Sequence, residues 1–174
     1  DGIPEAKALL AGMVGCRPEQ VIVGGNSSLT LMFDILSHAM IDGLLGGTPW
    51  CQVPDRKFLC PVPGYDRHFA MTEHFGFELV PVPMLADGPD MNLVERLVRE
   101  DASIKGIWCV PKYQNPTGVV FSHEVLERFA NLKPAAKDFR IFWDNAYCVH
   151  DLYPDEAEPL PDILSLCEQA GSPD

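Results

Sequence analysis

The chain has 174 residues, of which 47% are hydrophobic and 22% are charged. These values fit one domain with its own hydrophobic core and exclude a largely disordered chain. The net charge of -12 argues against a surface that binds nucleic acid or anionic membranes, and the sequence has no apolar run long enough to span a membrane.

The amino-terminal part predicts two helices and one strand. Residues 4–13 begin with a proline and are followed by Gly15, the pattern of a helix. Residues 21–23 are apolar and predict a short buried strand. The helix predicted over residues 29–45 is apolar on nearly every face, so we expect neighbours to cover it on several sides.

Short apolar strands then alternate with helices to the end of the chain. The predicted strands cover residues 58–60, 77–82, 104–110 and 139–143, and the predicted helices cover residues 68–74, 93–99, 122–131 and 161–170. Asp90 and Ser122 stand where helix N-caps are expected. This alternation predicts an α/β fold of three layers, with a mainly parallel sheet and helices on both faces. Ligands of such sheets bind beyond the carboxyl ends of the strands.

A turn of small residues precedes the first long helix. The backbone N–H groups of Asn26, Ser27 and Ser28 would stand at a helix N-terminus, where a phosphate gains hydrogen bonds and a favourable dipole. An ordinary N-cap is the alternative interpretation, because small polar residues serve it equally well. Leu29 replaces the third glycine of a dinucleotide-binding motif, and the turn has no P-loop lysine.

Polar residues also follow two later strands. Tyr65 comes after Pro63 and Gly64, and its ring could cover a planar ligand or pack on its own domain. Asn115 precedes Pro116, which disfavours the helical conformation at Asn115. The Asn115 amide is then held in one orientation at the end of a strand, although a bare turn would have the same composition.

Asp144 ends the last apolar strand, and Tyr147 follows three residues later. Burying a lone carboxylate costs several kcal/mol, so Asp144 needs either a buried cation or a place in a cleft. It could form a structural salt bridge, or it could accept a hydrogen bond from a cationic heteroaromatic nitrogen. One strand–helix–strand unit separates Asp144 from Asn115, so we expect the two at neighbouring strand ends.

The order of these motifs resembles that of the aspartate aminotransferase-like branch of the fold-type-I pyridoxal-phosphate (PLP) enzymes. The motifs are Gly-Asn-Ser-Ser at residues 25–28, Pro-Gly-Tyr-Asp-Arg at 63–67, Asn-Pro-Thr-Gly at 115–118 and Asp-Asn-Ala-Tyr at 144–147. Each motif is weak alone, but the last two at this spacing are specific together. The resemblance covers essentially the whole chain. The Lys-Tyr-Gln run at 112–114 looks most similar to a bacterial aspartate aminotransferase subgroup.

The resemblance implies PLP as the cofactor and a role for each motif. The turn at residues 26–28 would hold the cofactor phosphate, and Tyr65 would stack on the pyridine ring. Asn115 and Tyr147 would hydrogen-bond the phenolic oxygen of the ring. Asp144 would pair with the ring nitrogen and, with Tyr147, form the catalytic part of the site, because a protonated nitrogen makes the ring an electron sink.

The resemblance also implies parts of the family that this sequence lacks. Every lysine precedes Asp144, and none stands where the family has its Schiff-base lysine. Lys112 is interpreted as a surface or loop residue. The family's substrate-binding arginine belongs to a small domain that is also absent. Because residue 1 is not Met and residues 170–174 are turn-like, we expect a segment of a longer protein. With the lysine and the arginine missing, the resemblance implies that residues 1–174 are the central part of the PLP-binding large domain.

The expected function is transamination between an amino acid, aspartate by resemblance, and a 2-oxo acid, 2-oxoglutarate by resemblance, in a homodimer. A lyase or decarboxylase of the same fold type, a non-catalytic PLP-binding regulator module and a nucleotide-binding α/β domain are the alternatives, since one cofactor cradle serves several reactions. The six cysteines have no CxxC spacing, so no metal site is predicted, and thiols beside apolar runs fit a reducing cytoplasm.

Overall fold

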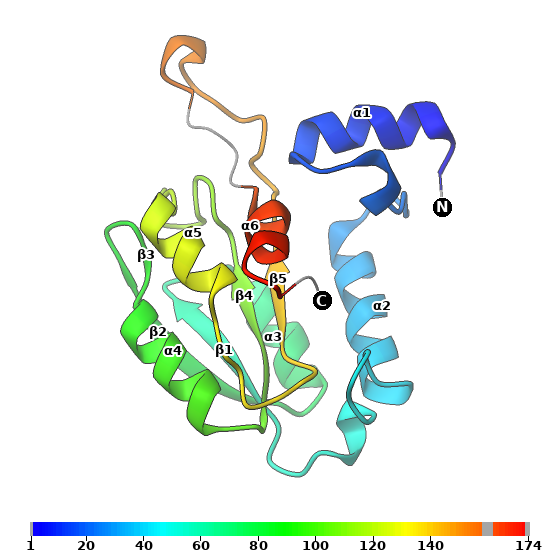
Figure 1. Cartoon of the computed structure of the whole chain (residues 1–174), viewed down its shortest axis with the longest axis vertical. Coiled ribbons are helices and arrows are strands. Elements are labelled where there is room, and N and C mark those ends of the chain that lie inside the picture. The colour runs from blue at the N-terminus through cyan, green and yellow to red at the C-terminus, as the bar shows by residue number, and fades with distance from the viewer. Residues whose placement is uncertain (1, 158–161, 173–174) are drawn as a thin grey trace.

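The computed structural model of the chain describes residues 2–157 and 162–172 (Figure 1). Its helices are α1 (Pro4–Val14), α2 (Ser28–Ile41), α3 (Asp66–His74), α4 (Met91–Glu100), α5 (His123–Ala130) and α6 (Ile163–Gln169), and its strands are β1 (Lys57–Val62), β2 (Glu78–Leu85), β3 (Gly88–Pro89), β4 (Ile104–Cys109) and β5 (Arg140–Trp143). Short 3-10 helices are η1 (Pro18–Gln20), η2 (Trp50–Gln52) and η3 (Pro154–Glu156). None of the helices described here is long and apolar enough to cross a membrane.

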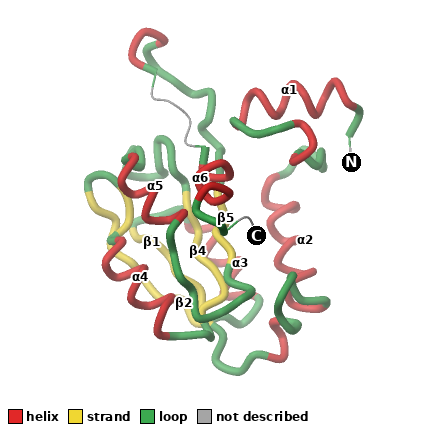
Figure 2. The backbone as a smooth tube through the Cα atoms, in the orientation of Figure 1, coloured by secondary structure: helices red, strands yellow, loops and turns green. Residues whose placement is uncertain are grey.

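The strands form one sheet in the order β3-β2-β1-β4-β5. The β2, β1, β4 and β5 strands are parallel, and only the two-residue β3 runs antiparallel, beside β2. The predicted mainly parallel α/β sheet is therefore confirmed. Cys109 of β4 pairs with Trp143 of β5, so these two strands end side by side. Because β1, β4 and β5 are parallel, the loops that follow them leave the sheet at the same end (Figure 2).

Two hydrophobic clusters cover the two faces of the sheet, because successive strand residues point to opposite faces. Leu59 and Ile107 join the cluster under α4, α5 and α6, which contains Val94, Val98, Phe129 and Ile163. Phe58 and Trp108 join the other cluster, which contains Leu36, Ala39 and Met40 of α2 together with Trp50 and Phe77. Figure 1 shows α4 and α5 on one side of the sheet and α2 on the other. Helices on both faces are confirmed.

Most elements predicted from local sequence patterns are present in the structure. Four predicted strands match β1, β2, β4 and β5, with small differences at their ends. Asp90 and Ser122 are the N-caps of α4 and α5, where their side-chain oxygens accept backbone N–H hydrogen bonds. The last helix begins at Ile163, and residue 161 of its predicted range lies outside the described residues. The short β3 was not predicted.

The strand predicted at residues 21–23 is wrong. Val21 has an extended backbone, but the segment pairs with none of the described strands, and Ile22 is 80% exposed. Apolar composition supplied the signal, but a strand also needs a partner for its backbone N–H and C=O groups.

The α2 helix is shorter and less covered than predicted. It ends at Ile41, before Gly43, which has a left-handed φ of 79°. Leu36, Ala39 and Met40 are buried, whereas Phe33, Ile35 and Ile41 are 41%, 49% and 70% exposed. The expectation that neighbours cover α2 on several sides is therefore wrong for the described residues, where α2 buries only one face.

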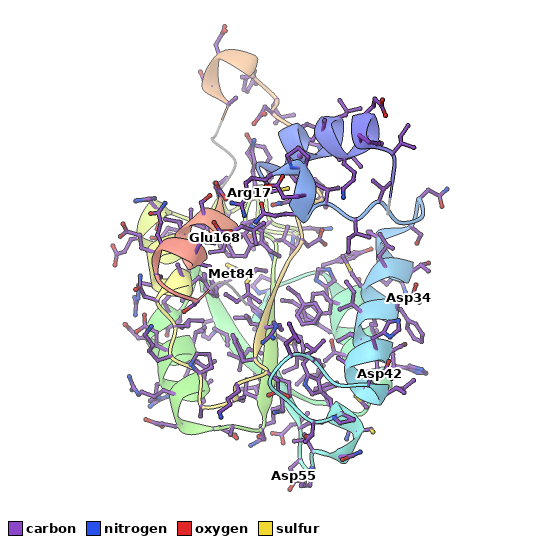
Figure 3. The ribbon with its side chains drawn as sticks, turned by 45° about the vertical axis from the view of Figure 1, so that its right-hand side comes forward. Arg17, Asp34, Asp42, Asp55, Met84 and Glu168 are labelled. Atoms are coloured by element: carbon purple, nitrogen blue, oxygen red, sulfur yellow. The ribbon has the colours of Figure 1, made fainter. Side chains whose placement is uncertain are left out.

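The amino-terminal segment is tied to the last helix by a surface ion pair. The guanidinium of Arg17 donates two hydrogen bonds to the carboxylate of Glu168 in α6, at 3.0 and 2.7 Å (Figure 3). This interaction lowers the pKa of Glu168. Both side chains are exposed, so the pair fixes position more than it stabilises the fold.

Candidate cofactor site at the carboxyl edge of the sheet

Asp144 lies at the carboxyl end of β5 with a defined orientation. Its backbone N–H donates to the carbonyl of Cys109 (2.8 Å), which continues the β4–β5 pairing by one residue. Its side chain is 12% exposed, and Oδ2 lies 3.0 Å from Nε2 of His68. Oδ1 accepts a hydrogen bond from the N–H of Ala146. A carboxylate only accepts hydrogen bonds, so the imidazole donates through Nε2.

His68 is a site residue that the sequence analysis missed. It lies in α3, is 1% exposed, and its ring stacks on the indole of Trp108 at a centroid distance of 4.4 Å. Thr72 fixes this arrangement, because its hydroxyl donates to the carbonyl of His68 and accepts a hydrogen bond from Trp108 Nε1. The available signal was a histidine three residues after Tyr65, one turn into a helix that starts at the site.

Tyr65 is connected to Asp144 through His68. It is the N-cap residue of α3, and its half-buried ring meets the imidazole edge to face, with centroids 5.0 Å apart. The structure thus brings together Tyr65 and Asp144, which the sequence placed in separate motifs.

The loop that carries Asn115 is held against the loop that leads to Tyr65. The side chain of Gln114 is buried, and its Nε2 donates to the carbonyl of Pro63 (2.9 Å). Its Oε1 accepts hydrogen bonds from the N–H and the hydroxyl of Thr117. The Asn115–Pro116 peptide bond is cis, as is Val62–Pro63. Asn115 follows β4 and Asp144 follows β5, so the prediction of neighbouring strand ends is confirmed.

Tyr147 lies in the turn after β5 and is half-buried, with its ring against His150. This turn is joined to the loop after β4 by Lys112, whose Nζ lies 2.8 Å from Oδ1 of Asp151. The interpretation of Lys112 as a surface residue is wrong. It does lie in a loop, but its side chain is only 3% exposed, because Asp151 neutralises its charge there.

Asn26, Ser27 and Ser28 are exposed and lie at the start of α2. Ser27 is the N-cap, and its hydroxyl accepts a hydrogen bond from the N–H of Thr30 (3.3 Å). The N-cap interpretation is therefore correct, and it is compatible with anion binding at the same helix N-terminus.

The α2 helix flanks the end of β5. Met32 and Ile35 of α2 line a mostly apolar groove of about 420 Å³ together with Asp144. A second cavity of about 420 Å³ is lined by Val21, Ile22, Trp143 and Asn145. In the described part of the chain, the buried Asn145 Oδ1 and Trp143 Nε1 have no hydrogen-bond partner.

The arrangement of sheet and helices is similar to that of solved aminotransferases. A crystal structure of an aspartate transaminase from Corynebacterium glutamicum superposes with a TM-score of 0.95 at 47% identity, covering 100% of this chain and 41% of that chain. An α-aminoadipate aminotransferase from Thermus thermophilus, solved with N-(5'-phosphopyridoxyl)-L-leucine, matches 98% of this chain and 39% of its own with a TM-score of 0.65 at 20% identity. The fold is that of the large domain of PLP-dependent transferases.

The sequence comparisons are more specific. The sequence model of the aspartate amino-transferase family matches residues 1–174, and the chain belongs to this family. It is 50% identical over 173 residues to a putative aminotransferase of Mycolicibacterium smegmatis and 47% identical over 174 residues to an aspartate aminotransferase of C. glutamicum. The chain spans about 40% of the length of each of these curated relatives and aligns over 99% of its own.

Proposed function

We propose that residues 1–174 form the central part of the PLP-binding large domain of an aminotransferase. Its reaction exchanges an amino group between an amino acid, aspartate, and a 2-oxo acid, 2-oxoglutarate. The family membership and the relatives' names support the reaction class. The observation that carries the proposal is the Asp144 carboxylate, which stands at a strand end with one oxygen fixed by His68. The Schiff-base lysine and the small domain belong to other parts of the protein.

The residues present fit PLP, which has an anionic phosphate and a ring nitrogen that can carry a proton. The N-terminus of α2, with the hydroxyls of Ser27 and Ser28, suits the phosphate. The carboxylate of Asp144 suits the protonated nitrogen, because an opposite charge nearby favours the protonated form. When bound, PLP supplies an electron sink for the carbanion at the α-carbon of the substrate.

Each side chain then has a distinct task. Asp144 holds the proton on the ring nitrogen, and His68 orients Asp144 by donating to Oδ2. Tyr65 covers one face of the ring and excludes water from it. Asn115 and Tyr147 hydrogen-bond the phenolic oxygen, and the turn at residues 26–28 anchors the phosphate. Asp144 thereby sets the charge of the ring, while the other groups fix its position.

The proposal extends to the assembly and the compartment. Phe33, Ile35 and Ile41 are exposed apolar side chains of α2, and such exposure supports a homodimer. All six cysteines are free thiols, which supports a reducing cytoplasm.

Substituting Asp144→Ala in the full-length protein tests the proposal. We expect transamination of aspartate with 2-oxoglutarate to fall by about 10²–10³-fold or more, because the ring nitrogen loses the charge that keeps it protonated. Asp55→Asn is the matched control, since Asp55 lies at the far end of the molecule (Figure 3) and asparagine tolerates its left-handed φ of 51°. Near-normal turnover in Asp144→Ala would overturn the assignment.

A further inference from the structure

A buried lysine lies directly beside the candidate site without belonging to any of its motifs. The Lys112 side chain is 3% exposed, and its Nζ lies 2.8 Å from Oδ1 of Asp151, 3.3 Å from the carbonyl of Cys148 and 5.2 Å from the centroid of the Tyr113 ring. Lysine is almost never buried unless it is paired, because removing an ammonium group from water costs several kcal/mol. The Lys112–Asp151 contact therefore forms despite the free-energy cost of removing the ammonium group from water.

Asp151 is held from a second direction as well. Its Oδ1 also accepts a hydrogen bond from the hydroxyl of Tyr113 at 2.6 Å. Lys112 first, and then Tyr113, lower the pKa of the Asp151 carboxyl, so the carboxylate is charged at neutral pH. Lys112 and Tyr113 are consecutive in the loop after β4, and both reach the same oxygen atom. Two adjacent residues of the loop after β4 therefore hold the Asp151 side chain at one oxygen.

The attachment joins the two segments that carry Asn115 and Tyr147. Lys112 precedes Asn115 by three residues, and Asp151 follows Tyr147 by four residues. The backbone pairing of β4 with β5 ends with the hydrogen bond from the Asp144 N–H to the Cys109 carbonyl. Beyond that point the Lys112–Asp151 pair connects the two segments.

The contacts of Lys112 exclude a direct chemical role for it. A lysine acts as a nucleophile only as a free amine, whereas this Nζ is engaged with a carboxylate and a carbonyl in a buried site. The Lys112 side chain is also only 3% exposed, which leaves a substrate carboxylate little access to it. What remains is control over the position of the neighbouring residues.

We propose that Lys112 and Asp151 form a clamp that sets the separation of the Asn115 amide and the Tyr147 hydroxyl, so that both reach one oxygen of the cofactor. The clamp rests on the proposed function, since it needs a ligand that both groups contact. Lys112 and Asp151 are positioning residues, and the groups that they position bind the ring.

The test uses full-length Lys112→Met and the double variant Lys112→Met/Asp151→Asn, which leaves no unpaired buried charge. We expect the PLP dissociation constant, measured by fluorescence titration of the apoprotein, to rise about 10-fold or more in both variants, as for other groups that orient ligand-binding residues. The absorbance of bound PLP should titrate at higher pH, because the phenolic oxygen loses hydrogen-bond donors that favour its charged form.

The control is Lys105→Met, which breaks another buried lysine–aspartate pair near the amino end of β4, away from the site. It should lower the unfolding temperature and change the PLP dissociation constant by less than about twofold, because it leaves the site loops in place. Unchanged PLP affinity and absorbance in both Lys112 variants would overturn the clamp alone. Absence of PLP binding by the unsubstituted protein would overturn the proposed function and the clamp with it.

Discussion

The two ends of β4 carry the same kind of interaction for different purposes. Lys105, near the amino end, pairs with Asp138 at 2.7 Å, and Lys112, beyond the carboxyl end, pairs with Asp151 at 2.8 Å. Both lysine side chains are buried. The difference lies in what each pair joins. Whether a buried ion pair points to function therefore depends on which segments it joins.

The amino-end pair is connected to structural elements alone. The second oxygen of Asp138 accepts a hydrogen bond from Nε1 of Trp50 (2.8 Å), which belongs to η2 and is fully buried. Lys105, Asp138 and Trp50 therefore attach the connection between α2 and β1 to the start of β4 and β5. The carboxyl-end pair instead attaches two loops that carry candidate cofactor ligands. We expect substitutions at the amino end to change the free energy of unfolding and those at the carboxyl end to change cofactor affinity.

The largest expected effect on folding comes from Lys105→Met. It leaves the Asp138 carboxylate buried with only the Trp50 N–H, and breaking such a pair costs about 3–5 kcal/mol. Urea denaturation followed by tryptophan fluorescence measures this loss. A loss below about 1 kcal/mol would mean that the pair contributes nothing beyond packing, and the contrast between the two ends would fail.

A smaller effect is expected from Gly106→Ala, at the residue after Lys105. An added Cβ would lie 2.5 Å from the Phe58 ring and 2.9 Å from the Arg140 carbonyl, so β4 or its neighbours must shift. Overpacking of this kind costs about 1–3 kcal/mol.

The matched substitution at the carboxyl end is Gly118→Ala. No atom lies within 4 Å of its added Cβ, and the cost comes only from the positive φ of 76°, about 1 kcal/mol. Thermal unfolding of the two variants compares them directly. An equal or larger loss in Gly118→Ala would contradict the ranking.

The smallest effect on the free energy of unfolding is expected at the partly exposed pair of Lys57, at the start of β1, and Asp101, which precedes β4. Hydrogen bonds from Lys57 and then Ser103 lower the pKa of Asp101 from 3.8 to about 2. A carboxyl with a lowered pKa stabilises the fold above its unfolded pKa, and this contribution is lost as the pH falls through the folded value. Asp101→Asn should therefore lower the free energy of unfolding by about 0.5–1 kcal/mol at pH 7. The difference from the unsubstituted protein should shrink between about pH 4 and pH 2. Thermal unfolding at pH 7 and pH 3 measures it, and a difference independent of pH would exclude the charge as its cause.

Local sequence signals were sufficient for most of the fold. The apolar runs of β1, β4 and β5 and the caps Asp90 and Ser122 act within a few residues, so their patterns identify the elements directly. The prediction failed where an element depends on a partner. Residues 21–23 have the composition of a strand but no described strand to pair with, and the apolar faces of α2 do not reveal which of them is covered.

The sequence by itself determined that polar motifs stand at the ends of parallel strands and that Asp144 and Asn115 occupy neighbouring ends. Only the tertiary structure decided which groups meet them. His68 lies 76 residues before Asp144, and Asp151 lies 39 residues after Lys112, so neither contact has a local pattern. Strand register and helix packing bring these pairs together. Lys112, expected as a surface or loop residue, is buried in its loop, and this burial depends on the Asp151 carboxylate that the fold places beside it.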